Sequence, residues 1–149
     1  MYVNSRMIGN VGESVAISEF VKMGVDVFIP FGQNTPVDIL VLIDDEILKI
    51  QVKTTQKVKN GKMSFDLCRT NGFTGKSIPY SKDEVDYIFL YCIENDYKGI
   101  VPFSEVDGKV EFTVRVEKTK NNQVCGINYD HEYEFAKWAD KNEKRKILL

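Results

Sequence analysis

The sequence predicts an α/β or α+β fold in which helices flank one mixed β-sheet. Residues 4–23 carry a helical apolar stripe and end before Gly24, a residue suited to a left-handed helix terminus. Residues 36–53 read as two largely apolar strands on either side of a tight turn at two aspartates, as in a β-hairpin. Residues 85–93 are almost continuously apolar or aromatic, which is typical of a central strand. We therefore expect the order helix, strand, β-hairpin, further strands and a closing helix.

The first helix is expected to begin at a cap supplied by Asn4 or Ser5. Gly9 and Gly12 lower helix stability relative to alanine, so we expect this helix to approach another backbone closely at that turn. Glu13 lies beside this thin stretch. The apolar stripe that should face the sheet consists of Ile8, Val11, Val15 and Phe20.

The hairpin is centred on Asp44 and Asp45, and the resulting register places Asp38 opposite Gln51. Lys53 lies one diagonal step from that pair. Because side chains alternate across a strand, these three polar residues share one face. An acid, an amide and an amine on a rigid hairpin are a candidate site for chemistry. The opposite face should be core and consists of Val37, Ile39, Val41, Ile43, Leu48, Ile50 and Val52.

The remaining elements follow from turn and strand signals. The Asn60-Gly61 pair gives a strong hairpin signal. Residues 70–84 contain glycine and proline and are expected to form a long loop. Asp130 is expected to cap a final helix that ends with Lys144, Arg145 and Lys146, in agreement with the helix dipole. Further strands are expected at residues 25–31, 63–69, 99–103 and 109–117.

The composition limits the class of protein. A chain of 149 residues with 43% apolar and 28% charged residues is long enough for one globular domain. No apolar run approaches the roughly 18 residues needed to span a bilayer, and the N-terminus lacks the apolar segment of a signal peptide. The widely spaced Cys68, Cys92 and Cys125 match neither a disulfide framework nor a zinc motif. We therefore expect a reduced, cytoplasmic protein without a membrane partner.

Charge is distributed unevenly along the chain. Residues 49–82 hold eight basic residues against one acidic residue, whereas the remainder holds 12 basic and 21 acidic residues. Taken alone, this charge favours a solvated hairpin that carries lysines. Its position directly after the polar cluster favours a surface that binds phosphates.

The constellation of Glu13, Pro36-Val37-Asp38 and Gln51-Val52-Lys53 resembles the site of PD-(D/E)XK nucleases. In that family an acidic residue on the first helix precedes an Asp at the start of one hairpin strand and a (D/E)-X-K triplet on the partner strand. The resemblance to members encoded in bacterial group I introns covers most of residues 4–105. It is carried by the stretches NVGESVAISEFVKMG, IPFGQNTPVDILV, IQVKTT and DYIFLYCIENDYKGIVPFSE.

The resemblance implies a restriction-endonuclease-like mixed sheet flanked by helices, with an added β-hairpin DNA-binding region. It also implies Mg²⁺-dependent hydrolysis of DNA that produces a double-strand break at a specific site. Glu13, Asp38, Gln51 and Lys53 would be catalytic, and Glu13, Asp38, Gln51 and the carbonyl of Val52 would hold the metal. Lys53 would position the attacking water or stabilise charge on the phosphate. Gln51 departs from the family's usual Asp or Glu, and a neutral amide should bind the metal less tightly.

The basic block would then contact double-stranded DNA through phosphates and base edges. The candidate residues are Lys57, Lys59, Asn60, Lys62, Arg69 and Lys76. Because one chain carries one site, a double-strand cut implies a homodimer or homotetramer.

We expect a single nuclease domain over residues 1–149, in three parts. The core covers about residues 4–105, a DNA-contacting insertion covers about 56–84, and a C-terminal strand and helix cover 109–149. The alternative functions are a Holliday junction resolvase, a restriction-type nuclease, or a DNA-binding module that has lost catalysis through Gln51.

Overall fold

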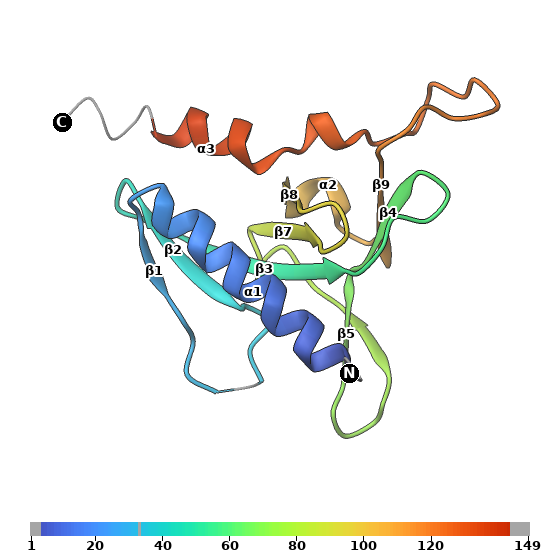
Figure 1. Cartoon of the computed structure of the whole chain (residues 1–149). Coiled ribbons are helices and arrows are strands. Elements are labelled where there is room, and N and C mark those ends of the chain that lie inside the picture. The colour runs from blue at the N-terminus through green and yellow to red at the C-terminus, as the bar shows by residue number, and fades with distance from the viewer. Residues whose placement is uncertain (1–3, 33, 144–149) are drawn as a thin grey trace.

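The centre of the molecule is a five-stranded mixed sheet with the order β1-β2-β3-β7-β8. The structure is a computed structural model that describes residues 4–32 and 34–143 (Figure 1). Only β3 and β7 pair in parallel, while the other neighbours in this sheet are antiparallel. The predicted mixed sheet is therefore confirmed. Its strands are β1 (Asp26–Phe28), β2 (Ile39–Ile43), β3 (Glu46–Thr55), β7 (Tyr87–Cys92) and β8 (Tyr97–Pro102).

Two different layers cover the two faces of the sheet. Helices α1 (Ser5–Lys22) and α3 (Phe135–Glu143) pack against one face, in a core that contains Phe20, Phe89 and Phe135. The short helix α2 (Phe103–Val106) and a two-stranded ribbon of β4 (Lys62–Asp66) and β9 (Glu111–Arg115) pack against the other. A second small hairpin, formed by β5 (Cys68–Thr70) and β6 (Ser77–Pro79), projects away from the sheet (Figure 1).

Helix α1 begins and ends as predicted. The Asn4 side chain caps it by accepting a hydrogen bond of 2.9 Å from the backbone N–H of Met7. Gly24 follows its end with φ of 71°. The predicted stripe is partly wrong, because Val11 is 43% exposed, while Gly12, Ala16 and Phe20 are buried. These three residues are spaced by four along the helix, so the contact at Gly12 decides which face meets the sheet.

Gly12 is where α1 meets β3. A β-carbon at this position would lie only 1.8 Å from Thr54 Oγ1, so only glycine fits there. The predicted close approach is therefore confirmed at Gly12. It is wrong for Gly9, where an added β-carbon would meet nothing within 4 Å.

The β2–β3 hairpin has the predicted register, with Ile39 opposite Ile50 and Val41 opposite Leu48. Asp44 and Asp45 form its two-residue turn with φ of 49° and 64°, a conformation that aspartate tolerates. The predicted apolar face lies in the core, with Leu48 half-buried at its margin.

The region after the hairpin differs from the prediction. Asn60 and Gly61 do form a tight turn, with φ of 52° and 70°, but it is closed only by a bridge between Lys59 and Lys62. Strand β4 pairs with the distant β9 because Phe65 and Phe112, opposite each other, are buried together against the sheet. Residues 70–84 are not a simple loop, since they contain the second strand of the β5–β6 hairpin.

The final helix begins later than predicted. Asp130 starts a 3₁₀ turn (Asp130–Glu132), and α3 begins only at Phe135. The basic residues expected at the end of this helix, Lys144, Arg145 and Lys146, lie outside the described residues. Over residues 4–32 and 34–143, no helix combines the length and apolar character needed to cross a membrane.

Candidate active site

The predicted polar cluster is assembled by the hairpin. The side-chain Nε2 of Gln51 donates a 2.6 Å hydrogen bond to Asp38 Oδ2. The backbone N–H of Val52 donates to the same oxygen at 2.8 Å. The backbone N–H of Asp38 in turn donates to the Ile50 carbonyl at 3.0 Å. The Asp38 carboxylate is therefore held by the partner strand, and Gln51, only 7% exposed, is buried beneath it.

Asp38 is the most perturbed acid of the cluster. Burial raises the pKa of its carboxyl to about 6, against the lowering effect of the Val52 N–H. The negative charge of Glu13 raises this pKa further, while Lys53 lowers it. Burial also raises the pKa of Glu13. The two carboxylates line a cavity of about 280 Å³ together with Arg6 and Asn10. Two carboxyl groups and the Arg6 side chain therefore share this cavity.

The Lys53 side chain is anchored on the other side of the cluster. Its Nζ donates hydrogen bonds to the Cys68 carbonyl at 2.9 Å and to the Tyr80 hydroxyl at 3.2 Å. Burial lowers the pKa of Lys53, while the nearby charges of Asp66 and Asp38 raise it. Lys53 is thus half-buried and tied to the base of the β5–β6 hairpin. Sequence reasoning missed Tyr80, because no local pattern places it beside a residue on β3.

The donor atoms of the site suit a hard divalent cation. Among the residues that the structure describes, no group of three or more His, Cys, Asp or Glu side chains could hold a metal ion. A cation would therefore need the carboxylates of Glu13 and Asp38, the amide oxygen of Gln51 and the carbonyl of Val52. All of these are oxygen donors, as Mg²⁺ and related ions prefer.

The Gln51 amide lies between the other candidate ligands. Its Nε2 donates to Asp38 Oδ2 at 2.6 Å and to the Val52 carbonyl at 3.3 Å. Rotated by half a turn, the amide would present Oε1 to these two oxygens, and oxygens gathered in this way are the ligands of a hard cation. The oxygen donors present therefore fit a metal ion, which would also neutralise the carboxylates of Glu13 and Asp38.

A large groove of about 900 Å³ opens on the Lys53 side of the cluster. One wall is the start of α1, at Ser5, Ile8 and Gly9, and the floor is the end of β3. Four of the six predicted DNA-contacting residues line it: Lys57, Lys59, Asn60 and Lys62. The groove therefore joins the candidate catalytic lysine to a positively charged surface.

The other two predicted DNA contacts lie on the β5–β6 hairpin. Arg69 forms an ion pair of 3.0 Å with Glu84, and its guanidinium lies 5.8 Å from the centre of the Tyr80 ring. Lys76 is exposed in the connection just before β6. The structure thus separates these two residues from the groove that holds the first four.

An oxygen-rich acidic cavity next to an anchored lysine, both built on one hairpin and its covering helix, defines a phosphodiester hydrolase of the metal-assisted class. The family model described as PD-(D/E)XK endonuclease matches residues 3–136. The chain therefore belongs to the PD-(D/E)XK endonuclease family, as its residues predict, and is a DNA-cleaving hydrolase. Nucleases of this family generally use divalent metal ions.

A solved structure supports the fold independently. The chain is similar to the structure of a bacterial homing endonuclease, I-Ssp6803I, with 23% sequence identity and a TM-score of 0.74. The match covers 97% of each chain, and at this identity it establishes that the two proteins share a fold. A search of curated proteins found no match.

Proposed function

We propose that this protein is a site-specific homing endonuclease that makes a Mg²⁺-dependent double-strand break in DNA. The observation that carries the proposal is the Asp38–Gln51 contact. This contact holds the Asp38 carboxyl, whose pKa is about 6, and the charge of Glu13 acts on the same carboxyl. Lys53 lines the groove that also contains Lys57, Lys59 and Lys62. The homing-endonuclease structure with the same fold supports this specific role.

Glu13, Asp38, the Gln51 amide oxygen and the Val52 carbonyl would hold the cation. When bound, Mg²⁺ would lower the pKa of a coordinated water and offset negative charge on the scissile phosphate. Asp38 must be ionised to act as a ligand, so protons compete with the metal for this side chain. The β2–β3 hairpin fixes Asp38 through the Gln51 and Val52 hydrogen bonds, which limits the rearrangement needed on binding.

Lys53 would supply positive charge to the phosphate or orient the attacking water. The Cys68 carbonyl and the Tyr80 hydroxyl take two of the three ammonium hydrogens, which leaves one donor for the substrate. Because burial lowers the pKa of Lys53, its ammonium also gives up a proton more readily than a solvated lysine.

DNA would lie in the large groove, with Lys57, Lys59 and Lys62 on phosphates. Asn60, Arg69 and Lys76 would contact base edges or further phosphates. We propose that the chain works as one nuclease domain, with its core at about residues 4–105. The insertion at 56–84 would contribute most of the DNA contacts, while residues 109–149 complete the domain.

The described residues of each chain form one proposed catalytic cluster, whereas a double-strand break requires two cuts. We therefore propose a homodimer or homotetramer that acts on double-stranded DNA in the cytoplasm.

Cleavage of supercoiled DNA tests the assignment. The substrate carries a site selected by the wild-type protein from a randomised duplex library, and it is incubated with and without Mg²⁺. Asp38→Ala and Lys53→Ala should reduce cleavage by at least about a hundredfold while duplex binding persists. Asp26→Ala and Lys22→Ala, at exposed positions on β1 and at the end of α1, are matched controls. Equal cleavage by the wild type and the folded site variants would refute the assignment.

The neutral amide of Gln51 is tested separately. Gln51→Glu should lower the Mg²⁺ concentration required for cleavage, because a carboxylate binds the cation more tightly than an amide does. A wild type that binds duplex DNA tightly without Mg²⁺ and does not cut with it, while Gln51→Glu does cut, would show that the site has lost catalysis through Gln51.

A further inference from the structure

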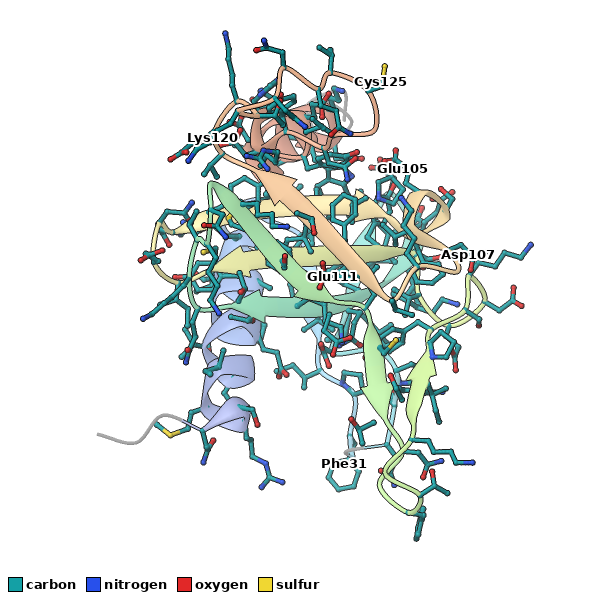
Figure 2. The ribbon with its side chains drawn as sticks, turned by 90° about the vertical axis from the view of Figure 1, so that its right-hand side faces the viewer. Phe31, Glu105, Asp107, Glu111, Lys120 and Cys125 are labelled. Atoms are coloured by element: carbon teal, nitrogen blue, oxygen red, sulfur yellow. The ribbon has the colours of Figure 1, made fainter. Side chains whose placement is uncertain are left out.

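The outer face of the β4–β9 ribbon gathers two basic side chains at one end. Its inner face is apolar, with Phe65 opposite Phe112 in the core. On the outer face, Lys62 lies directly opposite Arg115, and like charges in such a pair destabilise a sheet. Figure 2 looks onto this ribbon. Two cations gathered at one register position suit a ligand that carries negative charge.

The charge on this face changes along the ribbon. Next to the basic pair, the hydroxyl groups of Ser64 and Thr113 lie 3.4 Å apart. At the far end, Asp66 lies opposite Glu111. An anionic backbone can therefore cross the ribbon favourably only at its basic end.

The basic end continues into a second groove. This groove, of about 720 Å³, lies between the Asn60-Gly61 turn and the segment that follows β9. Figure 2 shows Lys120 above the ribbon, on that segment. Asn60 lines both this groove and the large groove that contains Lys53, so the Asn60-Gly61 turn borders both. Besides Asn60, the polar residues of the second groove are Arg115, Glu117, Lys118, Thr119, Lys120, Asn121 and Gln123.

The chemistry of the second groove matches that of duplex DNA. Three cations, Arg115, Lys118 and Lys120, face one carboxylate, that of Glu117. Lys118, Lys120, Asn121 and Gln123 are all exposed. Exposed lysines suit phosphates. Asn121 Oδ1 accepts a hydrogen bond from the Gln123 backbone N–H at 3.3 Å, and Gln123 Nε2 donates to the Cys125 carbonyl at 3.2 Å. When these exposed bonds are exchanged for contacts with a base, the paired donor and acceptor of an amide side chain suit the edge of adenine in the major groove.

We propose that Arg115 and residues 118–123 form a second part of the DNA interface, which reads base pairs beyond those at the cut. The proposal rests on the proposed function of the chain as a site-specific endonuclease. Four steps of about 3.4 Å separate Asp66, near Lys53, from Lys62 on β4, a distance of roughly 14 Å. With the strand along the duplex axis, that distance corresponds to about four base pairs at roughly 3.4 Å each, so the second groove contacts the duplex a little less than half a helical turn from the cut.

The salt dependence of binding tests the phosphate contacts. A random-sequence duplex long enough to span both grooves is titrated in EDTA at several salt concentrations. The double variant Lys118→Ala/Lys120→Ala should flatten the slope of log binding constant against log salt by about two units. Lys118→Arg/Lys120→Arg should keep the wild-type slope because the charges remain. The matched control Lys22→Ala/Lys141→Ala removes two exposed lysines from the helical side and should also leave the slope unchanged.

Selection of cleavage sites tests the reading of bases. Asn121→Ala and Gln123→Ala should each reduce the base preference about tenfold at outer positions of the selected site. The base preference next to the cut should stay as in the wild type. An unchanged salt slope in the alanine double variant, or unchanged outer preferences in both amide variants, would overturn the proposal. In both cases the wild type still binds and cuts duplex DNA, so the proposed function itself would stand. If the wild type itself neither binds nor cuts duplex DNA, the proposed function fails as well, and the two failures are thereby distinguished.

Discussion

At the scale of single residues, the Asp38 carboxyl gains hydrogen bonds from Gln51 and Val52, yet its pKa is raised to about 6. Burial and the neighbouring charge of Glu13 therefore outweigh these favourable contacts. Because the folded state binds this proton more tightly than the unfolded chain does, the contribution of Asp38 to stability falls as pH rises from about 4 through 6. In the metal-free protein, the ionised side chain destabilises the fold above that window.

Replacement of Asp38 by Asn should therefore stabilise the metal-free protein at pH 8. The amide removes the charge and keeps an oxygen that can accept from Gln51 or Val52. A rise of two pKa units has a ceiling of roughly 2.7 kcal/mol, and partial solvation lowers the expected gain in unfolding free energy to about 1–2 kcal/mol. Little change is expected at pH 4, where Asp38 is already protonated in the folded state.

Thermal or urea unfolding in EDTA at both pH values measures this effect. Asp26→Asn, at an exposed position on β1, is the matched control and should change stability little at either pH. An Asp38→Asn variant that is destabilised at pH 8 would show that the carboxylate is neutralised within the fold. Addition of Mg²⁺ should stabilise the wild type and not the variant, because only the wild type keeps the ligand.

At the scale of elements, the contact between α1 and β3 sets the position of Glu13 relative to Asp38. Gly12→Ala should destabilise the protein by about 1–3 kcal/mol, because its β-carbon would overlap Thr54 Oγ1. Gly9→Ala on the same helix should instead stabilise it by about 0.5–1 kcal/mol, since the new methyl group meets open space and alanine favours the helix. Urea unfolding of both variants measures the difference.

A second substitution tests the cause of this destabilisation. Thr54 Oγ1 is buried without a hydrogen-bond partner, so its removal costs little in hydrogen bonding. Thr54→Ala should therefore recover part of the stability that Gly12→Ala loses. If the double variant loses as much unfolding free energy as the two single variants together, or more, close packing at Thr54 is not the reason for the glycine.

The elements also differ in how far the sequence determines them. The β2–β3 register could be predicted because Asp44 and Asp45 fix the turn locally and alternation fixes the faces. The pairing of β4 with β9 could not, because Phe65 and Phe112 are far apart in sequence and meet only through the core. The same limit applies within the site. The Asp38–Gln51 contact follows from the hairpin, whereas the Lys53–Tyr80 contact depends on where the distant β5–β6 region folds back.

At the scale of the whole molecule, the two layers that cover the sheet differ in structure and in charge. Helices α1 and α3 cover one face, while the β4–β9 ribbon on the other face continues the lysine-lined groove. The net charge of −2 therefore conceals a basic surface on an acidic remainder, and the position of the charges decides how DNA approaches. One such surface leads to one proposed catalytic cluster among the described residues, so the proposed double-strand break requires a second copy of the chain.

Mixed oligomers provide the test of this requirement. Wild-type chains and Asp38→Asn chains, mixed in equal amounts and allowed to exchange, should form about half mixed dimers by random pairing. Each mixed dimer retains one active cluster, so it should cut one strand and convert supercoiled DNA to nicked circles. Gel electrophoresis should therefore show nicked product at a level that neither protein gives alone, while wild type mixed with Asp26→Asn gives linear product. If the mixture yields linear DNA in proportion to the wild-type fraction and no additional nicked circles, each chain makes both cuts by itself.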